Sequence, residues 1–420
     1  MPVVDQDRGE HMTYLTTGPK ALKTEVAAVL LWGPWRGMSA FAAACWELGC
    51  PSAGGDRRQC GIAMALPCDV DILCAGSRIV LKGWAPVKIF HGPNNISGMA
   101  GVLAAAQRQF GHEAVAYCHD LPKYGFTYDR LMPSALTDPR AAAAFMRTEA
   151  MTFDVFHFYF GESILGPGLH DVPFLLKQGK KVFFYFCGCD VRIAKDVIAK
   201  YPVSACRECW PVSCSANRTW ARKVALEMAT GTFVSTPDLL EFLPDSVLLP
   251  QPIPISQFAG RTPAGEETDG SRPIRVVHAP SDRVIKGTSY VIGAIAALQA
   301  RGVAIELVLL EGMRYDDAMN ACAAADIAVD QVLLGSHGQF AAEMMALGKP
   351  VICFIRDDLR RHYPEDLPVI SANPRTLEAV LLSLIEARAE WQAIGGAGRR
   401  YAARVHDSMA VGRKALEYYG

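Results

Sequence analysis

Short apolar runs alternate with longer helix-like segments from residue 86 onward. The run PVKIFHG predicts a strand, MAGVLAAAQRQFG predicts a helix, and HEAVAYC predicts the next strand, so that 86–118 forms a βαβ unit. Three more apolar runs continue the series: FDVFHFYFG, KKVFFYF and TFVST. Strands that alternate with helices form parallel sheets. The pattern therefore predicts one doubly wound α/β domain over residues 86–250.

A second series of the same kind follows a stretch that is rich in proline, glycine and polar residues. That stretch, residues 251–273, has the composition of a linker. Beyond it, four apolar runs predict strands with helices between them: IRVVHAP, AIELVLL, DIAVDQV and KPVICFI. They define a second domain over 274–395, and the remaining residues, 396–420, predict a C-terminal helix.

Two Rossmann-like domains in tandem predict an α/β protein whose doubly wound domains face each other across a cleft. Open parallel sheets bind ligands beyond the carboxyl ends of their strands. We therefore expect the binding residues in the loops that follow the strands.

Residues 1–85 differ from the rest of the chain. They carry four of the seven tryptophans and five of the thirteen cysteines, without sustained helix or strand periodicity. One interpretation is an N-terminal extension that is disordered, or that is translated upstream of the native start. The other is an interfacial anchor built on its tryptophan and leucine side chains.

The charge balance excludes an electrostatic footprint for nucleic acid, because the 42 Lys and Arg residues nearly equal the 43 Asp and Glu residues. No apolar stretch reaches the roughly 18 to 20 residues that span a bilayer, so we expect no transmembrane segment. The cysteines are spread over a long α/β chain without a secretory signal. We expect a cytoplasmic protein, with peripheral contact to a membrane left open.

An anion site is predicted where Lys286 and Gly287 separate a strand from a helix. Free N–H groups and the positive end of the helix dipole favour an anion there. Arg283 lies three residues before Lys286, and the two cations together would clamp a diphosphate. The alternative is a solvated Arg/Lys turn.

Glu343 is the charged residue of an otherwise largely apolar helical segment, QFAAEMMALG. A carboxylate at the cleft end of such a helix suits two vicinal hydroxyls, as on a ribose. Gly335 and Gly338 precede the helix and would let a ligand approach the backbone. The alternative is that Glu343 only complements its helix N-terminus.

These motifs resemble those of the family-4 retaining glycosyltransferases (glycosyltransferase group 1), which have the GT-B fold. The matching pieces in the second domain are KGT, AAADIAVDQ and EMMALGKPVI. A weaker match, HGPNNISGMAGVLAAAQRQFGHEA, resembles the glycine loop and first helix of the acceptor domain. The resemblance covers about three quarters of the chain.

The resemblance implies a retaining, hexosyltransferase-like enzyme of polysaccharide or glycoconjugate biosynthesis. It would move a sugar from a nucleoside diphosphate sugar to an unidentified acceptor, which could be a saccharide, a lipid-linked sugar or a small molecule. No cofactor would be required for the chemistry, which would rest on positioning and on stabilising the leaving diphosphate.

Residue by residue, the resemblance implies that Lys286 meets the diphosphate and Glu343 the ribose. Ser281 stands where the family's phosphate arginine more often lies, and Gly335 stands where the first Glu of its E-x7-E pattern lies. The donor site would also include Gly287 and Gly338. The expected glycine loop comprises Gly92, Asn94, Asn95 and Gly98.

The segment FCGCD falls where many relatives have a His-Gly-x-Asp turn. Cys187 takes the place of that histidine, while Asp190 is retained. His157, at a strand end, is a candidate substitute, although it could equally be a structural histidine. The expected catalytic residues are therefore Arg283, Lys286, His157 and Asp190.

A structural zinc site is predicted from cysteine spacing, since C-x2-C lets two sulfurs reach one tetrahedral ion. Buried free thiols and a redox pair are the alternatives. The candidate ligands are Cys187, Cys189, Cys206, Cys209 and Cys214.

Two other functions stay open. A non-catalytic sugar-nucleotide-binding protein would explain Gly335 and Cys187. A nucleotide-sugar epimerase is a third candidate, because the same two-domain fold hosts both activities. An epimerase needs carboxylates that face the sugar, which Gly335 argues against.

Overall fold

The structure is a computed structural model that describes residues 85–209, 218–261 and 272–419. Residues Pro86–Gly420 form one compact unit. The expectations for the N-terminal extension lie outside the described residues and stay predictions. None of the helices in the described ranges is both long and apolar enough to cross a bilayer.

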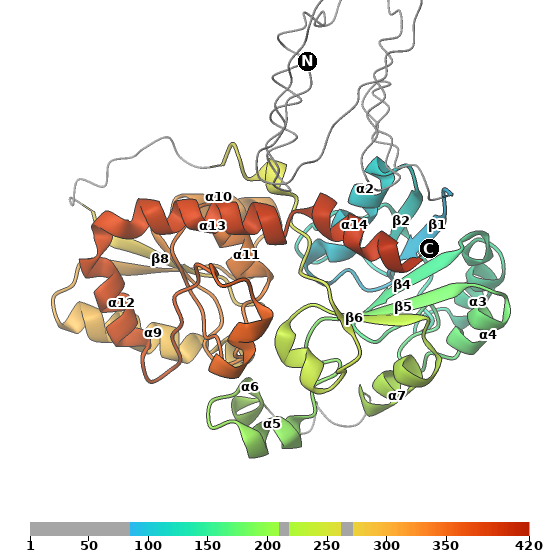
Figure 1. The fold of residues 1–420 in the computed structure, drawn as a ribbon, viewed down its shortest axis with the longest axis horizontal. Coiled ribbons are helices and arrows are strands. Elements are labelled where there is room, and N and C mark those ends of the chain that lie inside the picture. Colours follow the sequence, from blue (N-terminus) through green and yellow to red (C-terminus); the bar gives the residue numbers. More distant parts are fainter. Residues whose placement is uncertain (1–84, 210–217, 262–271, 420) are drawn as a thin grey trace, which may run out of the picture. The chain divides into compact units, whose positions relative to one another are not determined.

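The first sheet is parallel throughout and has seven strands in the order β3-β2-β1-β4-β5-β6-β7 (Figure 1). Its strands are β1 (Lys88–His91), β2 (Glu113–Cys118), β3 (Arg130–Leu131), β4 (Val155–Tyr159), β5 (Lys181–Phe186), β6 (Gly231–Val234) and β7 (Val247–Leu248). All five predicted strands form, because continuous apolar runs suit strands that are covered on both faces. The two edge strands, β3 and β7, are too short to show a sequence period.

Helices cover both faces of this sheet. The helices of residues 86–250 are α2 (Met99–Gln109), α3 (Pro139–Arg147), α4 (Val172–Lys177), α5 (Ala194–Lys200), α6 (Ala205–Glu208) and α7 (Arg218–Met228), with 3-10 turns at Ile96–Gly98, Ala150–Thr152 and Pro237–Glu241. Of these, α5 and α6 lie apart from the sheet, and α6 contacts α8 (Arg283–Lys286). The core on one face is rich in phenylalanine, with Phe90, Phe156, Phe158 and Phe184 fully buried. We refer to residues 86–250 together with the last helix, α14 (Ser408–Tyr419), as the first half.

The second sheet has four parallel strands in the order β11-β10-β8-β9. Its elements are β8 (Ile274–His278), α8 (Arg283–Lys286), α9 (Thr288–Ala300), β9 (Ile305–Leu309), α10 (Tyr315–Ala323), β10 (Ile327–Val329), α11 (Gln339–Ala346), β11 (Val351–Ile352) and α12 (Leu377–Glu386). Further 3-10 turns lie at Ile255–Gln257, Asp357–His362 and Arg388–Glu390. We refer to residues 272–405 as the second half. The predicted architecture of two parallel α/β sheets is confirmed.

The C-terminal segment 396–420, expected as one helix, holds the end of α13 (Trp391–Val405) and all of α14 (Ser408–Tyr419). The helices separate because Ile253 pairs with the backbone between them: its N–H donates to the His406 carbonyl at 2.7 Å, and its carbonyl accepts from Ser408 N–H at 2.9 Å. At this pairing the chain passes from the second half back to the first.

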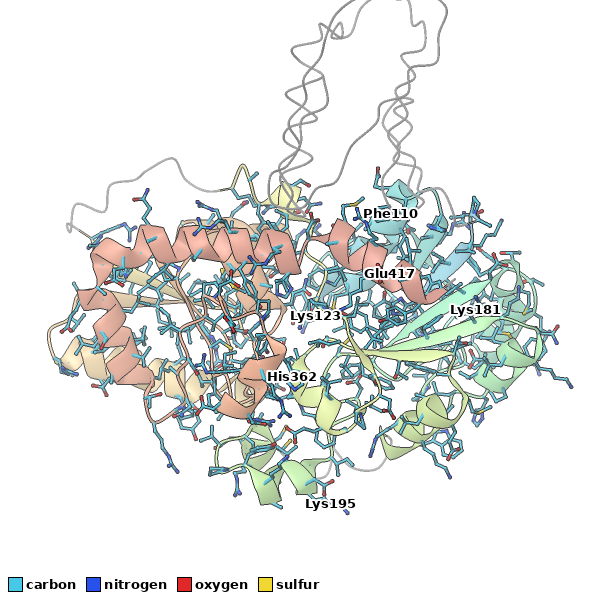
Figure 2. The ribbon with its side chains drawn as sticks, in the orientation of Figure 1. Phe110, Lys123, Lys181, Lys195, His362 and Glu417 are labelled. Atoms are coloured by element: carbon cyan, nitrogen blue, oxygen red, sulfur yellow. The ribbon has the colours of Figure 1, made fainter. Side chains whose placement is uncertain are left out.

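Helix α14 then returns to the first half, where it packs against α2 (Figure 1). Gly412 lies close to Ala106, and Lys181 of β5 donates from Nζ to the Tyr419 carbonyl at 2.7 Å. Figure 2 labels Lys181 on the sheet and Glu417 on α14. The last helix therefore completes the first half, not the second.

Candidate functional site

The strongest polar cluster lies beyond the carboxyl ends of β8 and β10. Lys286, at the end of α8, donates from Nζ to Asp330 Oδ1 at 3.1 Å and to Gln331 Oε1 at 2.6 Å. Asp330 and Gln331 directly follow β10 and are buried. The ammonium is thus held by a carboxylate and an amide at the sheet edge where this class of fold binds ligands.

The loop 335–338 closes over this cluster. Gly338 N–H donates to Asp330 Oδ2 at 2.9 Å, and the Gln331 amide donates to the Ser336 carbonyl. A Cβ at Gly338 would lie 3.3 Å from both Asp330 Oδ2 and Lys286 Nζ. Glycine therefore lets the loop backbone approach the ion pair.

Gly287 separates α8 from α9 in a left-handed conformation, with a φ of 76°. A Cβ there would lie 2.6 Å from Val332, so both the backbone angle and the space favour glycine. Ser281 lies exposed in the turn before α8. Lys286 and Gly287 thus lie at a tight junction between two helices, α8 and α9. The sequence predicts only the second of these helices.

Arg283 does not join Lys286. Its guanidinium pairs with Glu311 at 2.8 and 2.5 Å and is largely exposed. Beside it a surface cavity of about 280 Å³ is lined by Thr288, Ser289 and Tyr290 among others. Neither Lys286 nor Glu343 lines this cavity. We place the candidate site at the buried cluster, because its charges are desolvated and ordered.

Glu343 lies on α11 and is buried. Its Oε1 accepts from the Tyr315 phenol at 3.0 Å and from the Gln339 amide at 3.3 Å. Burial raises the pKa of Glu343 to about 7, although the hydrogen bonds from Gln339 and Tyr315 act in the opposite direction. Near neutral pH this carboxyl is therefore poised between its two protonation states.

The expected glycine loop lies beside Glu343. Gln339 donates from Nε2 to the Ser97 carbonyl at 3.3 Å, and the ring of Tyr315 lies 5.2 Å from that of Phe126. Gly98, with a φ of 77°, leaves room for the Phe126 ring, which would lie 3.0 Å from a Cβ. The glycine loop and the Glu343 helix thus meet.

The other residues of that loop fix its shape. Gly92 has a φ of 135°, and a Cβ there would lie 2.3 Å from the Tyr117 carbonyl oxygen. Asn94 donates to Glu162 at 2.5 Å, while Asn95 donates to the Thr127 carbonyl at 2.8 Å. Both amides are engaged within the first half.

Gly335 has a φ of 78° and faces the side chain of Arg356. The Arg356 guanidinium pairs with Glu241 and Asp358 and stacks on the Tyr201 ring, 3.7 Å from its centroid. The space beyond Gly335 is therefore filled by the aliphatic part of the Arg356 side chain, from the loop after β11.

Asp190 caps the turn that follows β5. It accepts from Cys187 N–H at 3.0 Å and from Gly188 N–H at 2.7 Å. Burial raises its pKa to about 6, although these hydrogen bonds act to lower it. Burial also raises the pKa of the Cys187 thiol, which donates to the Tyr185 carbonyl at 3.3 Å.

His157 lies away from both groups. It is fully buried between the first sheet and α14, where Tyr419 contacts its Nδ1 at 2.6 Å and Tyr159 stacks on its ring. Burial lowers the pKa of His157 well below its ordinary value. These contacts favour the structural interpretation over the catalytic one.

The zinc prediction is not settled by the described residues. Cys187, Cys189, Cys206 and Cys209 form no disulfide bond within the described ranges, and Cys214 lies outside them. Among the ranges that the structure describes, no three His, Cys, Asp or Glu side chains are grouped to hold a metal ion. Cys189 instead accepts from Arg192 at 3.9 Å.

Sequence reasoning missed four residues that the structure brings to these clusters. Asp330 and Gln331 could have been found, since they are a polar pair directly after a buried strand. Tyr315 and Asp238 carry no such signal. Their hydrogen-bond partners, Glu343 for Tyr315 and Ser336 for Asp238, lie 28 and 98 residues away along the chain.

The chain resembles known proteins in its structure. No protein-family model and no curated protein sequence matches the chain. Among solved structures it is similar to sucrose-phosphate synthase from Thermosynechococcus elongatus, with 16% identity and a TM-score of 0.54 over 80% of this chain and 95% of that one.

It is also similar to HepE from Anabaena in complex with UDP and glucose, with 11% identity and a TM-score of 0.56 over 79% of this chain and 98% of that one. The catalytic domain of starch synthase IV from Arabidopsis thaliana, bound to ADP and acarbose, gives 11% identity and a TM-score of 0.54 over 80% and 99% of the two chains. Similarity at these identities establishes the fold, and the two parallel α/β halves of this chain form a GT-B fold.

Proposed function

We propose that the protein is a glycosyltransferase that moves a sugar from a nucleoside diphosphate sugar to an acceptor, with retention of anomeric configuration. The carrying observation is that Lys286 and Glu343, a cation and a carboxylate, both follow strands of the second sheet in a GT-B fold. Structures of similar fold bind UDP, UDP-glucose or ADP. Residues 274–395 would hold the donor and residues 86–250 the acceptor.

In this proposal Lys286 stabilises the departing diphosphate. Its ammonium is already desolvated, so a phosphate oxygen that replaces one of its present acceptors gains a strong, ordered electrostatic contact. The cost of ordering the lysine side chain has been met in the folded protein, which is the condition for electrostatic preorganisation. Arg283 would have to leave Glu311 to join it.

Glu343 would accept hydrogen bonds from the two ribose hydroxyls. Tyr315 and Gln339 bind only its Oε1, and both stabilise the ionised form that a hydroxyl donor requires. The glycine loop, which contacts the same helix through Ser97, would lie next to the bound donor.

The catalytic step would rest on positioning and charge stabilisation by side chains of this chain. No side-chain nucleophile is assigned. A structural zinc held by the cysteines of 187–214 remains a separate proposal, and it would have no part in the transfer.

A second function is favoured by a specific observation. Arg356 fills the space beyond Gly335, where the resembled family carries its sugar-facing Glu, and Cys187 replaces a sugar-binding histidine. Both changes suit a protein that binds the nucleotide sugar without transferring the sugar.

The deciding experiment mixes the full-length protein with UDP-, ADP- and GDP-sugars and a panel of acceptors, and measures the nucleoside diphosphate released. Transfer predicts release that needs an acceptor and fails in Lys286→Ala. Binding measured by calorimetry without any release would favour the second function. The anomeric configuration of the product, read by proton NMR, tests retention.

A further inference from the structure

A buried ion pair of the first half lies next to the second half. Arg192 donates from Nε to Asp238 Oδ2 at 2.8 Å, and its Nη2 lies 2.7 Å from the same oxygen. Both side chains are less than a tenth exposed. Although burial alone would raise it, the Arg192 charge and the Ser336 hydrogen bond lower the pKa of Asp238. Asp238 is therefore held ionised.

The second oxygen of this carboxylate crosses to the second half. Ser336 donates from Oγ to Asp238 Oδ1 at 2.6 Å, and both residues are buried. Asp238 belongs to the 3-10 turn after β6, whereas Ser336 belongs to the loop over the Lys286 cluster. One carboxylate thus bridges an arginine of one half and a serine of the other.

The same loop holds the lysine. The Ser336 carbonyl accepts from the Gln331 amide, whose oxygen accepts from Lys286 Nζ at 2.6 Å. Two residues on, Gly338 N–H binds the carboxylate that pairs with Lys286. An unbroken series of hydrogen bonds therefore runs from Arg192 through Asp238 and Ser336 to Lys286.

We propose that Asp238 is a positioning residue for the donor site: it fixes loop 335–338, and through that loop the Lys286 ammonium, from the opposite half of the molecule. The assignment rests on the proposed function in one respect, because it takes Lys286 to be the diphosphate ligand. It gives the first half a share in donor binding without any contact between Asp238 and the donor.

The geometry suits this role better than a general contribution to stability. Arg192 contacts only Oδ2 of Asp238, so the Ser336 bond to Oδ1 is a separate constraint that acts on the loop. The bond is short, charge-assisted and removed from water, which are the conditions for a strong and directional contact. A loop held in this way meets an incoming phosphate in one arrangement.

Ser336→Ala is the variant that isolates the bridge, because it keeps the backbone carbonyl that Gln331 uses and leaves Asp238 paired with Arg192. Tyr185→Phe is the matched control, since it removes a hydroxyl of the first half that donates to the Leu249 carbonyl at the same length, 2.6 Å, and to the Pro250 carbonyl at 3.1 Å. Asp238→Asn is a second variant, which changes the acceptor of the same hydrogen bond.

The first measurement uses the full-length chain without ligand. Hydrogen exchange of the Gly338 amide should accelerate in Ser336→Ala, because that amide's acceptor cluster loses its support, while Tyr185→Phe should leave it unchanged. Exchange at Gly338 that matches wild type in both Ser336→Ala and Asp238→Asn would overturn the proposal.

The second measurement is the dissociation constant for UDP. We expect Ser336→Ala to weaken UDP binding about tenfold, and to change it less than about twofold in a Lys286→Ala background, where the lysine to be positioned is absent. Equal losses in both backgrounds would mean that the serine acts independently of Lys286 and would overturn the proposal.

The two measurements separate this inference from the proposed function. If wild type binds no nucleoside diphosphate, the proposed function fails, and the Gly338 exchange rate alone decides whether Asp238 fixes the loop. If wild type binds UDP but Ser336→Ala binds it equally well, the proposed function stands and the positioning role of Asp238 does not.

Discussion

The side chain of Arg356 covers Gly335: a Cβ at Gly335 would lie 2.5 Å from Arg356 Cγ, and Arg356 N–H donates to the Gly335 carbonyl at 2.8 Å. A side chain at position 335 would therefore overlap with the side chain of Arg356. An acidic side chain, which the resembled family carries at this position, could not be accommodated while Arg356 keeps its pairing with Glu241 and Asp358.

This relationship predicts that Gly335→Ala is destabilising for two separate reasons. A left-handed φ costs a non-glycine residue about 1–2 kcal/mol, and the overlap with Arg356 adds about 1–3 kcal/mol. In an Arg356→Ala background only the first cost should remain. Urea denaturation of the four proteins measures both, and an equal cost of Gly335→Ala in the two backgrounds would contradict the steric relationship.

Lys286→Ala should weaken UDP binding by about 1.5–3 kcal/mol, the contribution of a charge-assisted hydrogen bond. Titration calorimetry measures it. Arg283→Ala is the matched control and should have a smaller effect, because the Arg283 guanidinium already pairs with Glu311 at the surface. An unchanged dissociation constant for Lys286→Ala would remove this lysine from the diphosphate site.

Lys286→Ala should also lower stability, since Asp330 would be left as a buried carboxylate without its cation. Combining it with Asp330→Asn should restore part of the loss in a thermal melt, without restoring UDP binding. Recovery of binding in the double variant would mean that Lys286 serves only to neutralise Asp330.

Glu343→Gln should weaken the binding of UDP but not that of 2′-deoxy-UDP, because only the ribose offers two vicinal hydroxyls to the carboxylate. The pKa of about 7 adds a pH test. The ionised fraction of Glu343 falls as pH drops below 7, so the advantage of wild type over Glu343→Gln should decline toward pH 5. Taking the ratio of the two constants cancels the titration of UDP itself. Equal binding of the ribo and deoxy nucleotides by wild type would exclude Glu343 as a ribose ligand.

Tyr315→Phe should move this pH dependence upward by about one pH unit, because it removes a hydrogen bond that stabilises the ionised form. The groups that face Glu343 are Tyr315 and Cys322 from α10, Asp330 after β10 and Lys286 from α8. Tyr124→Phe, at the same contact between the halves, is the control and should leave the midpoint unchanged. The midpoint is read from UDP titrations between pH 5.5 and 8.5, and a midpoint that stays at its wild-type value in Tyr315→Phe would contradict the role of this phenol.

The sequence was sufficient for the sheets because their strands are continuous apolar runs, such as KVFFYF in β5 and IRVVH in β8. Lys286 and Glu343 also lie where the sequence predicts them, in segments that follow buried strands, whereas their roles toward a donor stay predictions. Arg283 shows where that reasoning stops. It lies one helical turn from Lys286, yet α8 directs the two cations to different carboxylates, and no sequence spacing encodes that choice.

The contacts between the halves could not be predicted for a related reason. Asp238 and Ser336 are 98 residues apart, and Ile253 interrupts the C-terminal helices by pairing with His406 and Ser408. Such contacts depend on how two separately folded sheets meet. Local propensity and hydrophobic period carry no information about how the two halves pack against each other.

His406, in the break between α13 and α14, predicts a pH dependence of stability. Its Nδ1 lies 3.0 Å from the Gln251 carbonyl and so donates, while Nε2 is buried and has no hydrogen-bond partner among the residues that the structure describes. Burial, with the nearby His337, lowers the pKa of His406 to about 3, whereas its ordinary value is 6.5. The folded protein therefore holds this ring neutral.

Because the unfolded chain takes up a proton that folded His406 refuses, the stabilisation is complete above pH 6.5 and is lost as pH falls toward 3. The loss should approach about 1.4 kcal/mol per pH unit. His406→Asn keeps a donor for Gln251 and does not titrate, so the difference in unfolding free energy between wild type and variant should shrink by about 1.2 kcal/mol from pH 6 to pH 5. Urea denaturation at pH 7, 6 and 5 measures it. Parallel pH profiles for the two proteins would show that His406 is protonated, or exposed, in the folded state.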